Sequence, residues 1–246
     1  MALPKLTVMK HKLSLPSTGE KITYRPFLVK EEKILMMAMQ SEDPVEMVVA
    51  LREIIKNCVE SDINVERLPV FDVEYIFLQL RSKSVGETID LSYTVPDEIC
   101  EVDKKECLFA LQIILDDITV EKTKEHNPLI DITDSIKIKM KYPEIEMSTS
   151  VSAGLTGDSS NMVDVTFKMI EGCIEYIMDG EEIHKPDDYT EKEIDDFINS
   201  LSSAQFKSIQ GFFETMPKLR KRVTGKCSKC EKENEKVLEG LADFFV

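Results

Sequence analysis

The sequence has no tryptophan and only three histidines among its 246 residues. The HExxH, GxSxG, GxGxxG and P-loop motifs are also absent, so the metal, nucleophile and phosphate chemistry that those spacings support is not indicated. Paired aspartates at 116–117, 187–188 and 195–196 do not replace them, because adjacent residues on a helix or strand point in different directions. We therefore predict a protein that is not an enzyme and has no catalytic residues.

Positive charge is also scarce. The chain has 31 Lys and Arg against 46 Asp and Glu, a formal net charge of -15. A surface this negative repels phosphate backbones and anionic lipid headgroups, so neither nucleic acid nor a membrane is expected as a partner. The N-terminus, "MALPKLTVMKHKLSLPS", does not match a signal peptide, and no apolar run reaches the length of a membrane span. We expect a soluble protein made in a cytoplasm.

The hydrophobic patterning predicts an α+β protein with a helical body. Apolar residues recur at helical spacing in some segments and alternate with polar residues in others, as in "IKIKMKY". The predicted order is an N-terminal β-hairpin and helices (1–86), a β-rich insertion (87–147), a flexible loop (148–161), a helical segment (162–217) and a C-terminal C-x-x-C hairpin packed on the β section (218–246).

Several helix boundaries are also predicted. N-caps are expected at Asp43, Asp72, Thr190 and Ser202, the last two in capping boxes with Glu193 and Gln205. Another helix is expected to run from Met162 to Met178. The Met-Met-Ala-Met run at 36–39 leaves two interpretations open, an adaptable contact surface or a buried helix, and the apolar run favours the buried helix.

The six cysteines point to reduced thiols or metal ligands rather than disulfides, because no export signal is present. Cys58 and Cys173 lie among apolar neighbours, which favours core positions. Cys227 and Cys230 form a C-x-x-C between two strand-like segments, and Cys100 and Cys107 also lie between two strands. Two such turns brought together make a four-cysteine zinc ribbon. Two alternatives stay open: one structural zinc, or free thiols in a degenerate site.

The segment 218–232, "KLRKRVTGKCSKCEK", is locally basic. A basic zinc ribbon can bind nucleic acid, so an adaptor that touches nucleic acid or the transcription machinery is an alternative function. The segment has no interleaved aromatic residues on which bases could stack. A contact with an acidic protein surface, or a plain solvated turn, explains the same charges.

Five stretches occur in an order that resembles the T4-type baseplate hub protein family of contractile-tailed bacteriophages. They are "ITYRPFLVKEEKILMMAMQ", "FDVEYIFLQLRSKSVGE", "IKMKYP", "DYTEKEIDDFINSLSSAQFKSIQGFFETMPKLR" and the terminal "CSKC" with "LEGLADFF". The similarity extends over nearly the whole chain. In that family the middle β section usually carries a tight C-x-x-C, and the wider spacing of Cys100 and Cys107 departs from it.

This resemblance implies a non-enzymatic part in building the hub of a phage tail baseplate. The implied partners are other hub proteins, the tape-measure protein and other tail proteins, and a homo-oligomer stays open. The implied location is the virion tail baseplate, the host cytoplasm during assembly, or both.

Overall fold

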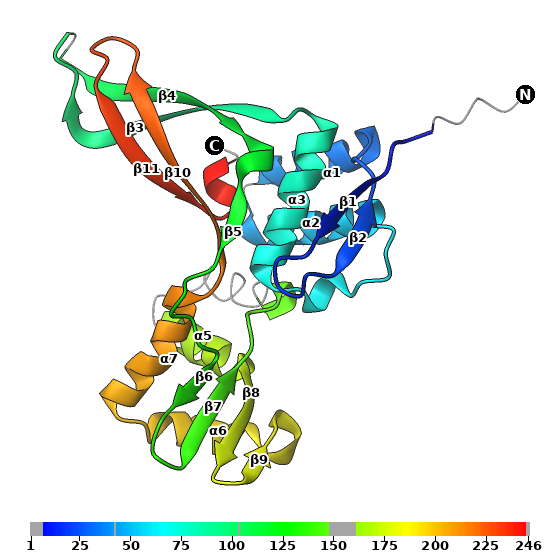
Figure 1. Ribbon diagram of the computed structural model, residues 1–246, viewed down its shortest axis with the longest axis vertical. Coiled ribbons are helices and arrows are strands. Elements are labelled where there is room, and N and C mark those ends of the chain that lie inside the picture. Colours follow the sequence, from blue (N-terminus) through cyan, green and yellow to red (C-terminus); the bar gives the residue numbers. More distant parts are fainter. Residues whose placement is uncertain (1–6, 42, 103, 148–160, 245–246) are drawn as a thin grey trace, which may run out of the picture.

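The computed structural model describes residues 7–41, 43–102, 104–147 and 161–244 (Figure 1). The predicted α+β class is confirmed, with helices and antiparallel sheets along one chain. The loop predicted at 148–161 lies outside the described residues, apart from Asn161, which begins α5 (Asn161–Gly172). In Figure 1 the chain forms an upper part, which holds both described ends, and a lower part around β6 to β9.

The upper part begins with the predicted hairpin, β1 (His11–Ser14) and β2 (Lys21–Tyr24), which packs on three helices. These are α1 (Val29–Ser41), α2 (Pro44–Cys58) and α3 (Val70–Ser84), with the short 3-10 helix η1 (Val65–Arg67) between the last two. Their shared core includes Ile22, Ile54 and Ile76, none of which is exposed.

Of the two N-caps predicted in this part, one is confirmed and one is wrong. The Asp43 side chain accepts a hydrogen bond from the Val45 N–H, and Pro44 opens α2. Asp72, in contrast, lies inside α3, whose N-cap is Pro69. The buried Asp72 carboxylate instead accepts hydrogen bonds from the N–H and the hydroxyl of Ser17, so it fixes the β1–β2 turn against α3.

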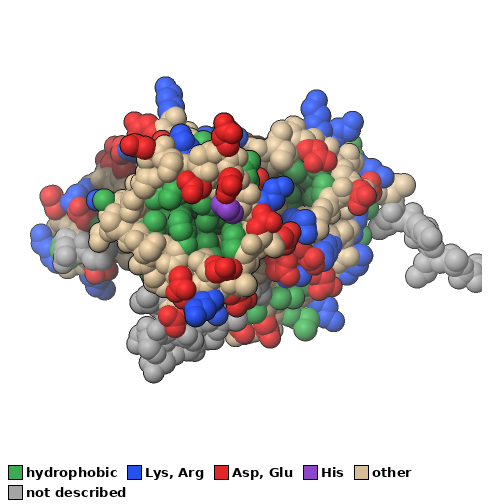
Figure 2. Space-filling view, turned by 90° about the horizontal axis from the view of Figure 1, so that it is seen from below, with side chains coloured by type: hydrophobic (Ala, Val, Ile, Leu, Met, Phe, Trp, Pro, Cys, Tyr) green, Lys and Arg blue, Asp and Glu red, His purple; other side chains and the backbone are tan. Residues whose placement is uncertain are grey.

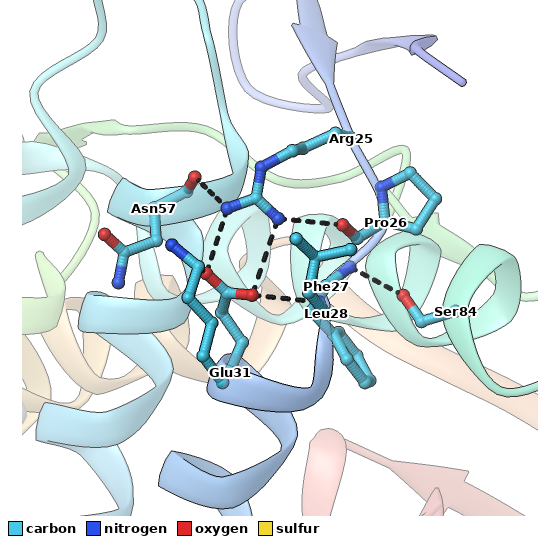
Figure 3. Close-up of polar contacts among 8 residues, drawn as sticks. Arg25, Pro26, Phe27, Leu28, Glu31, Asn57 and Ser84 are labelled. Carbon is cyan, nitrogen blue, oxygen red and sulfur yellow. Dashed lines mark hydrogen bonds and ion pairs between the residues drawn. The ribbon is translucent and has the colours of Figure 1, made fainter. Parts of the chain in front are cut away.

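A buried ion pair joins the segment after β2 to α1 (Figure 3). The Arg25 guanidinium donates to Glu31 at 2.9 Å and to the Asn57 carbonyl at 2.8 Å. The Glu31 side chain is fully buried and also accepts from the Leu28 N–H at 2.8 Å. Burial alone raises the pKa of Glu31, but these hydrogen bonds and that of Lys30 outweigh it and hold the pKa at about 2.

A second sheet contains strands from the middle and the end of the chain. Its order is β11 (Glu233–Glu239), β10 (Lys218–Cys227), β4 (Glu106–Ile114) and β3 (Thr88–Ile99), and β5 (Thr119–Glu121) also pairs with β10. A 3-10 helix, η2 (Leu115–Asp117), separates β4 from β5. As predicted, the C-terminal hairpin completes the β section, because Cys227 pairs with Phe109.

The last described residues, η4 (Leu241–Phe244), form a 3-10 helix that docks back on this part. Leu238 and Phe244 are buried in the core between α3 and the sheet, and Leu241 is partly buried there. These three residues therefore dock the end of the described chain on the upper part.

The lower part is a four-stranded antiparallel sheet covered by helices. Its order is β6 (Leu129–Asp131), β7 (Ile136–Met140), β8 (Ile174–Asp179) and β9 (Glu182–His184). The strands of 87–147 are therefore divided between two sheets. The helix expected to run from Met162 to Met178 is wrong, because α5 ends at Gly172 and β8 follows.

Helices α6 (Glu191–Asn199) and α7 (Ser203–Thr215) complete the lower core, with the 3-10 helix η3 (Pro186–Asp188) before them. Both predicted capping boxes are confirmed. The hydroxyls of Thr190 and Ser202 accept hydrogen bonds from the backbone N–H groups of Glu193 and Gln205, whose side-chain oxygens accept from the backbone N–H groups of Thr190 and Ser202. Ile194, Ile198, Ile209 and Phe212 are buried against the sheet.

The chain also links the two parts through residues 143–145. The Val70 N–H donates to the Pro143 carbonyl at 3.1 Å, and the Ile145 N–H donates to the Leu68 carbonyl at 3.1 Å. The rings of Phe71 and Tyr142 meet edge to face, with centroids 5.1 Å apart. The start of α3 therefore holds the end of β7 in place.

The methionine run on α1 is not buried. Met36, Met37 and Met39 are 56%, 61% and 50% exposed, and only Ala38 between them faces the core. The buried-helix interpretation favoured by the sequence is therefore wrong. Helix α1 packs on α2 and the upper core through one side, which includes Ile34 and Leu35. Apolar side chains on its other side are exposed because no neighbouring element covers them.

Candidate metal centre

The four cysteines of the predicted zinc ribbon converge at the far end of the second sheet. Their Sγ atoms all lie within 4.8 Å of one another, and those of Cys107 and Cys230 are 3.7 Å apart. Four thiolates at about 2.3 Å from one tetrahedral ion lie about 3.8 Å from each other. Cys100, Cys107 and Cys227 are buried and Cys230 is partly buried. The donor set and its spacing therefore fit a closed four-sulfur metal site.

Two turns of the same design present Cys100 and Cys227. In the first turn the Lys104 N–H donates to the Cys100 carbonyl, and the Cys100 N–H donates to the Lys105 carbonyl. In the second turn the Glu231 N–H donates to the Cys227 carbonyl, and the Cys227 N–H donates to the Lys232 carbonyl. Lys104 and Glu231 are also the two non-glycine residues with positive φ in the described part of the chain, at 59° and 58°.

This shared geometry explains the unusual C-x6-C spacing. The second turn carries its second cysteine, Cys230, three residues after Cys227, whereas the sequence has no cysteine three residues after Cys100. Cys107 follows Lys105 by two residues and lies on β4, which runs back beside the end of β3, where Ile99 pairs with Glu106. The first turn therefore contributes one sulfur donor, Cys100, and the second donor comes from the adjoining strand.

Aromatic side chains close one side of the cluster. Phe109 is fully buried, and its ring stacks on that of Tyr93 with centroids 5.5 Å apart. The Tyr93 hydroxyl donates to the Asn234 carbonyl at 3.0 Å. Gly225 faces both rings: a Cβ there lies only 2.9 Å from the Phe109 Cβ and 3.0 Å from the Tyr93 hydroxyl. The β10 backbone can lie this close to Phe109 and Tyr93 only because position 225 has no side chain.

The turns prepare one sulfur for ligation. Backbone N–H groups of Cys230 and Lys229 donate to the Cys227 sulfur and lower the pKa of that thiol. Burial, followed by the neighbouring sulfurs, raises the pKa of the Cys107 thiol. Four thiolates this close repel one another unless a cation lies among them, so a metal ion would stabilise the ionised set.

The remaining cysteines and the histidines lie elsewhere. Cys58 and Cys173 are fully buried in the upper and lower cores, as predicted, and burial raises the pKa of each thiol, to about 11 and about 12. His126 is held between the hydroxyls of Thr215 and Tyr142, at 3.0 and 3.2 Å. His184 is about half exposed and lies 3.9 Å from Glu182, and His11 packs on Tyr24.

The basic residues of 218–232 are largely neutralised. Within the described part of the chain, five of them form ion pairs with glutamates: Lys218 and Arg220 with Glu239, Arg222 with Glu235, Lys226 with Glu233, and Lys232 with Glu98. Lys221 donates to the Asp117 carbonyl. This pairing was not visible in the sequence, because the pairs with Glu233, Glu235 and Glu239 depend on the register of β10 against β11, and Lys232 meets Glu98 on β3.

The fold and the cluster together define an α+β protein with a zinc-ribbon-like four-cysteine site. Residues 8–246 match the model of the T4 bacteriophage base plate protein family, so the chain belongs to that family. No curated protein and no solved structure gives a significant match. Among the described residues, the helices are too short or too polar to cross a membrane.

Proposed function

We propose that this protein is a structural or assembly component of the hub of a phage tail baseplate and acts through protein contacts rather than catalysis. The observation that carries the proposal is the family match, which extends from residue 8 to residue 246. The proposed partners are other hub proteins, the tape-measure protein or other tail proteins, and the proposed location is the tail baseplate or the host cytoplasm during assembly.

The sulfur cluster supports a structural role within this function. Cys227, Cys230, Cys100 and Cys107 would hold one zinc ion, and four protein ligands leave no open position for a substrate. Such an ion would tie the β3–β4 turn to the β10–β11 turn, which are more than 120 residues apart in the sequence. It would thereby stabilise a rigid arm that projects from the helical body (Figure 1).

The outer face of α1 supports a role in binding proteins. Large apolar side chains are exposed on it and beside it: Leu28, Val29, Met36, Met37, Met39 and Val85. An exposed apolar patch of this kind is common at protein contacts, and methionine adapts to varied partner surfaces.

A genetic experiment tests the proposal. Phage with an early stop codon in this gene should fail to form complete baseplates, and the intact gene supplied in trans should restore them. Mass spectrometry of purified tails would then show whether the chain remains in the virion or acts only during assembly. Normal baseplates formed without the chain would refute the proposal.

The alternative, an adaptor that binds nucleic acid through 218–232, has weaker support. The ion pairs along β10 and β11 neutralise most of its cations. Retention of the purified protein on DNA that falls steeply with salt would favour this alternative, whereas co-purification with tail proteins at high salt would favour the baseplate role.

A further inference from the structure

A hollow lies at the lower end of the molecule, where the β8–β9 turn, η3 and α6 meet the sheet. Its volume is about 400 Å³. Apolar side chains form its inner surface: Ile136, Ile177, Ile194 and Phe197. Figure 2, seen from below, shows this apolar hollow open to solvent and surrounded by acidic side chains. It is large enough to receive an apolar side chain from another molecule.

The rim of the hollow is negative. Asp179, Asp188 and Glu193 line it together with His184, and residues 179–196 contain nine acidic and two basic residues. Within the described part of the chain, the ion pairs involve none of these three carboxylates. Two of them are nevertheless fixed in position, since Asp188 accepts from the Lys185 N–H at 2.7 Å and Glu193 accepts from the Thr190 N–H at 2.8 Å.

We propose that this acidic hollow binds one apolar side chain, flanked by Lys or Arg, from a segment of another protein of the tail. The apolar side chain would fill the hollow, and the flanking cations would meet the carboxylates on its rim. The inference names the partner chemistry for the contacts proposed above, and in that respect it rests on the proposed function.

The charges of this chain favour a different protein over a second copy as the occupant. The basic segment 218–232 is the chain's main concentration of cations, and its register against β11 already pairs them with glutamates. A second copy would have to give up these pairs to enter the hollow. Nucleic acid is repelled by the rim and has no apolar side chain to insert.

A direct test uses the purified full-length protein and a synthetic peptide, acetyl-Gly-Lys-Lys-Leu-Arg-Lys-Gly-amide. The δ1-methyl NMR signals of isoleucine report the site, because three isoleucines line the hollow. We expect the signals of Ile136, Ile177 and Ile194 to shift on titration, and the binding to weaken as salt rises. Peptides with Ser in place of Leu, or Glu in place of the cations, should bind at least about threefold more weakly.

A charge-removing variant tests the rim. Asp179→Asn with Glu193→Gln removes two charges and keeps the side-chain shapes, and Gln is accepted in a capping box. It should weaken peptide binding at least about threefold. Asp62→Asn with Glu53→Gln removes the same charge from exposed positions on the upper part and should leave binding unchanged.

Three results would overturn the inference: no shift of these methyl signals at millimolar peptide, equal binding of the acidic peptide, or equal weakening by both variants. The proposed function is judged separately, by baseplate formation. If the peptide does not bind but the null phage lacks complete baseplates, only the inference about the hollow is rejected. If the peptide binds but the null phage forms normal baseplates, the proposed baseplate role is rejected.

Discussion

The sulfur atoms of Cys107 and Cys230 lie 3.7 Å apart, although the two residues are separated by 123 positions in the sequence. The contact exists because β10 inserts between β11 and β4 and carries the C-terminal turn to the β3–β4 turn. The end of the chain is thus part of the same structural unit as its middle.

We predict about one zinc ion per chain, released when Cys227 is changed to Ser. The substitution removes the thiol whose pKa the turn N–H groups lower, and it leaves three donors. Metal analysis of the purified protein measures the stoichiometry, and thermal unfolding with and without a chelator measures the stabilisation. Cys58→Ala is the control, since Cys58 lies in the upper core away from the cluster and its loss should leave the zinc content unchanged. A metal-free wild-type protein would contradict the prediction.

We predict opposite effects for two Gly→Ala substitutions. Gly225→Ala places a Cβ 2.9 Å from the Phe109 Cβ and should destabilise the protein by about 1–3 kcal/mol through overpacking. Gly211→Ala lies within α7 with open space around the new Cβ and should stabilise it by about 0.5–1 kcal/mol. Denaturant unfolding compares the two free energies. Equal changes in the free energy of unfolding would show that Phe109 and Tyr93 do not pack tightly against β10 at position 225.

Much of the fold could be predicted because its signals are local. The caps at Asp43, Thr190 and Ser202 are set by residues three or fewer positions away. The four-cysteine cluster could also be proposed from the sequence, because each turn lies between recognisable strands. The matching backbone of the two turns could not, since the turn at Lys104 has no glycine to mark its positive φ.

The failures share a physical cause, which is tertiary context. Asp72 matched an N-cap by composition, but its carboxylate bonds to Ser17, 55 residues away. The segment 174–178 has apolar residues that suit a helix, yet pairing with β7 makes it a strand. The exposure of Met36 and Met37 depends on which elements pack around α1, and no local pattern records that.

We predict that Glu31→Gln lowers the free energy of unfolding at pH 7 by about 3–5 kcal/mol, because it breaks a buried ion pair with Arg25. The wild-type carboxyl has a folded pKa of about 2 against an ordinary 4.5. Its contribution of about 3 kcal/mol is therefore present above pH 4.5 and is lost as the pH falls towards 2. The free energy of unfolding of the variant should therefore fall less steeply than that of the wild type between pH 4.5 and pH 2. Glu32→Gln, at an exposed neighbouring position, serves as the control.

Glu74 should act with the opposite sign. Its carboxylate accepts the Leu241 N–H at 3.2 Å, and burial raises its pKa from 4.5 to about 7. Because the folded state holds this proton more tightly than the unfolded chain, the contribution of Glu74 to stability is fully present below pH 4.5 and falls by about 3 kcal/mol as the pH rises through 7. Glu74→Gln keeps the acceptor oxygen without the charge, so it should stabilise the protein at pH 8 and flatten this dependence. Free energies of unfolding of the wild type and the variant, measured at pH 5 and pH 8, test this prediction. The same change between the two pH values in both proteins would mean that a group other than Glu74 titrates.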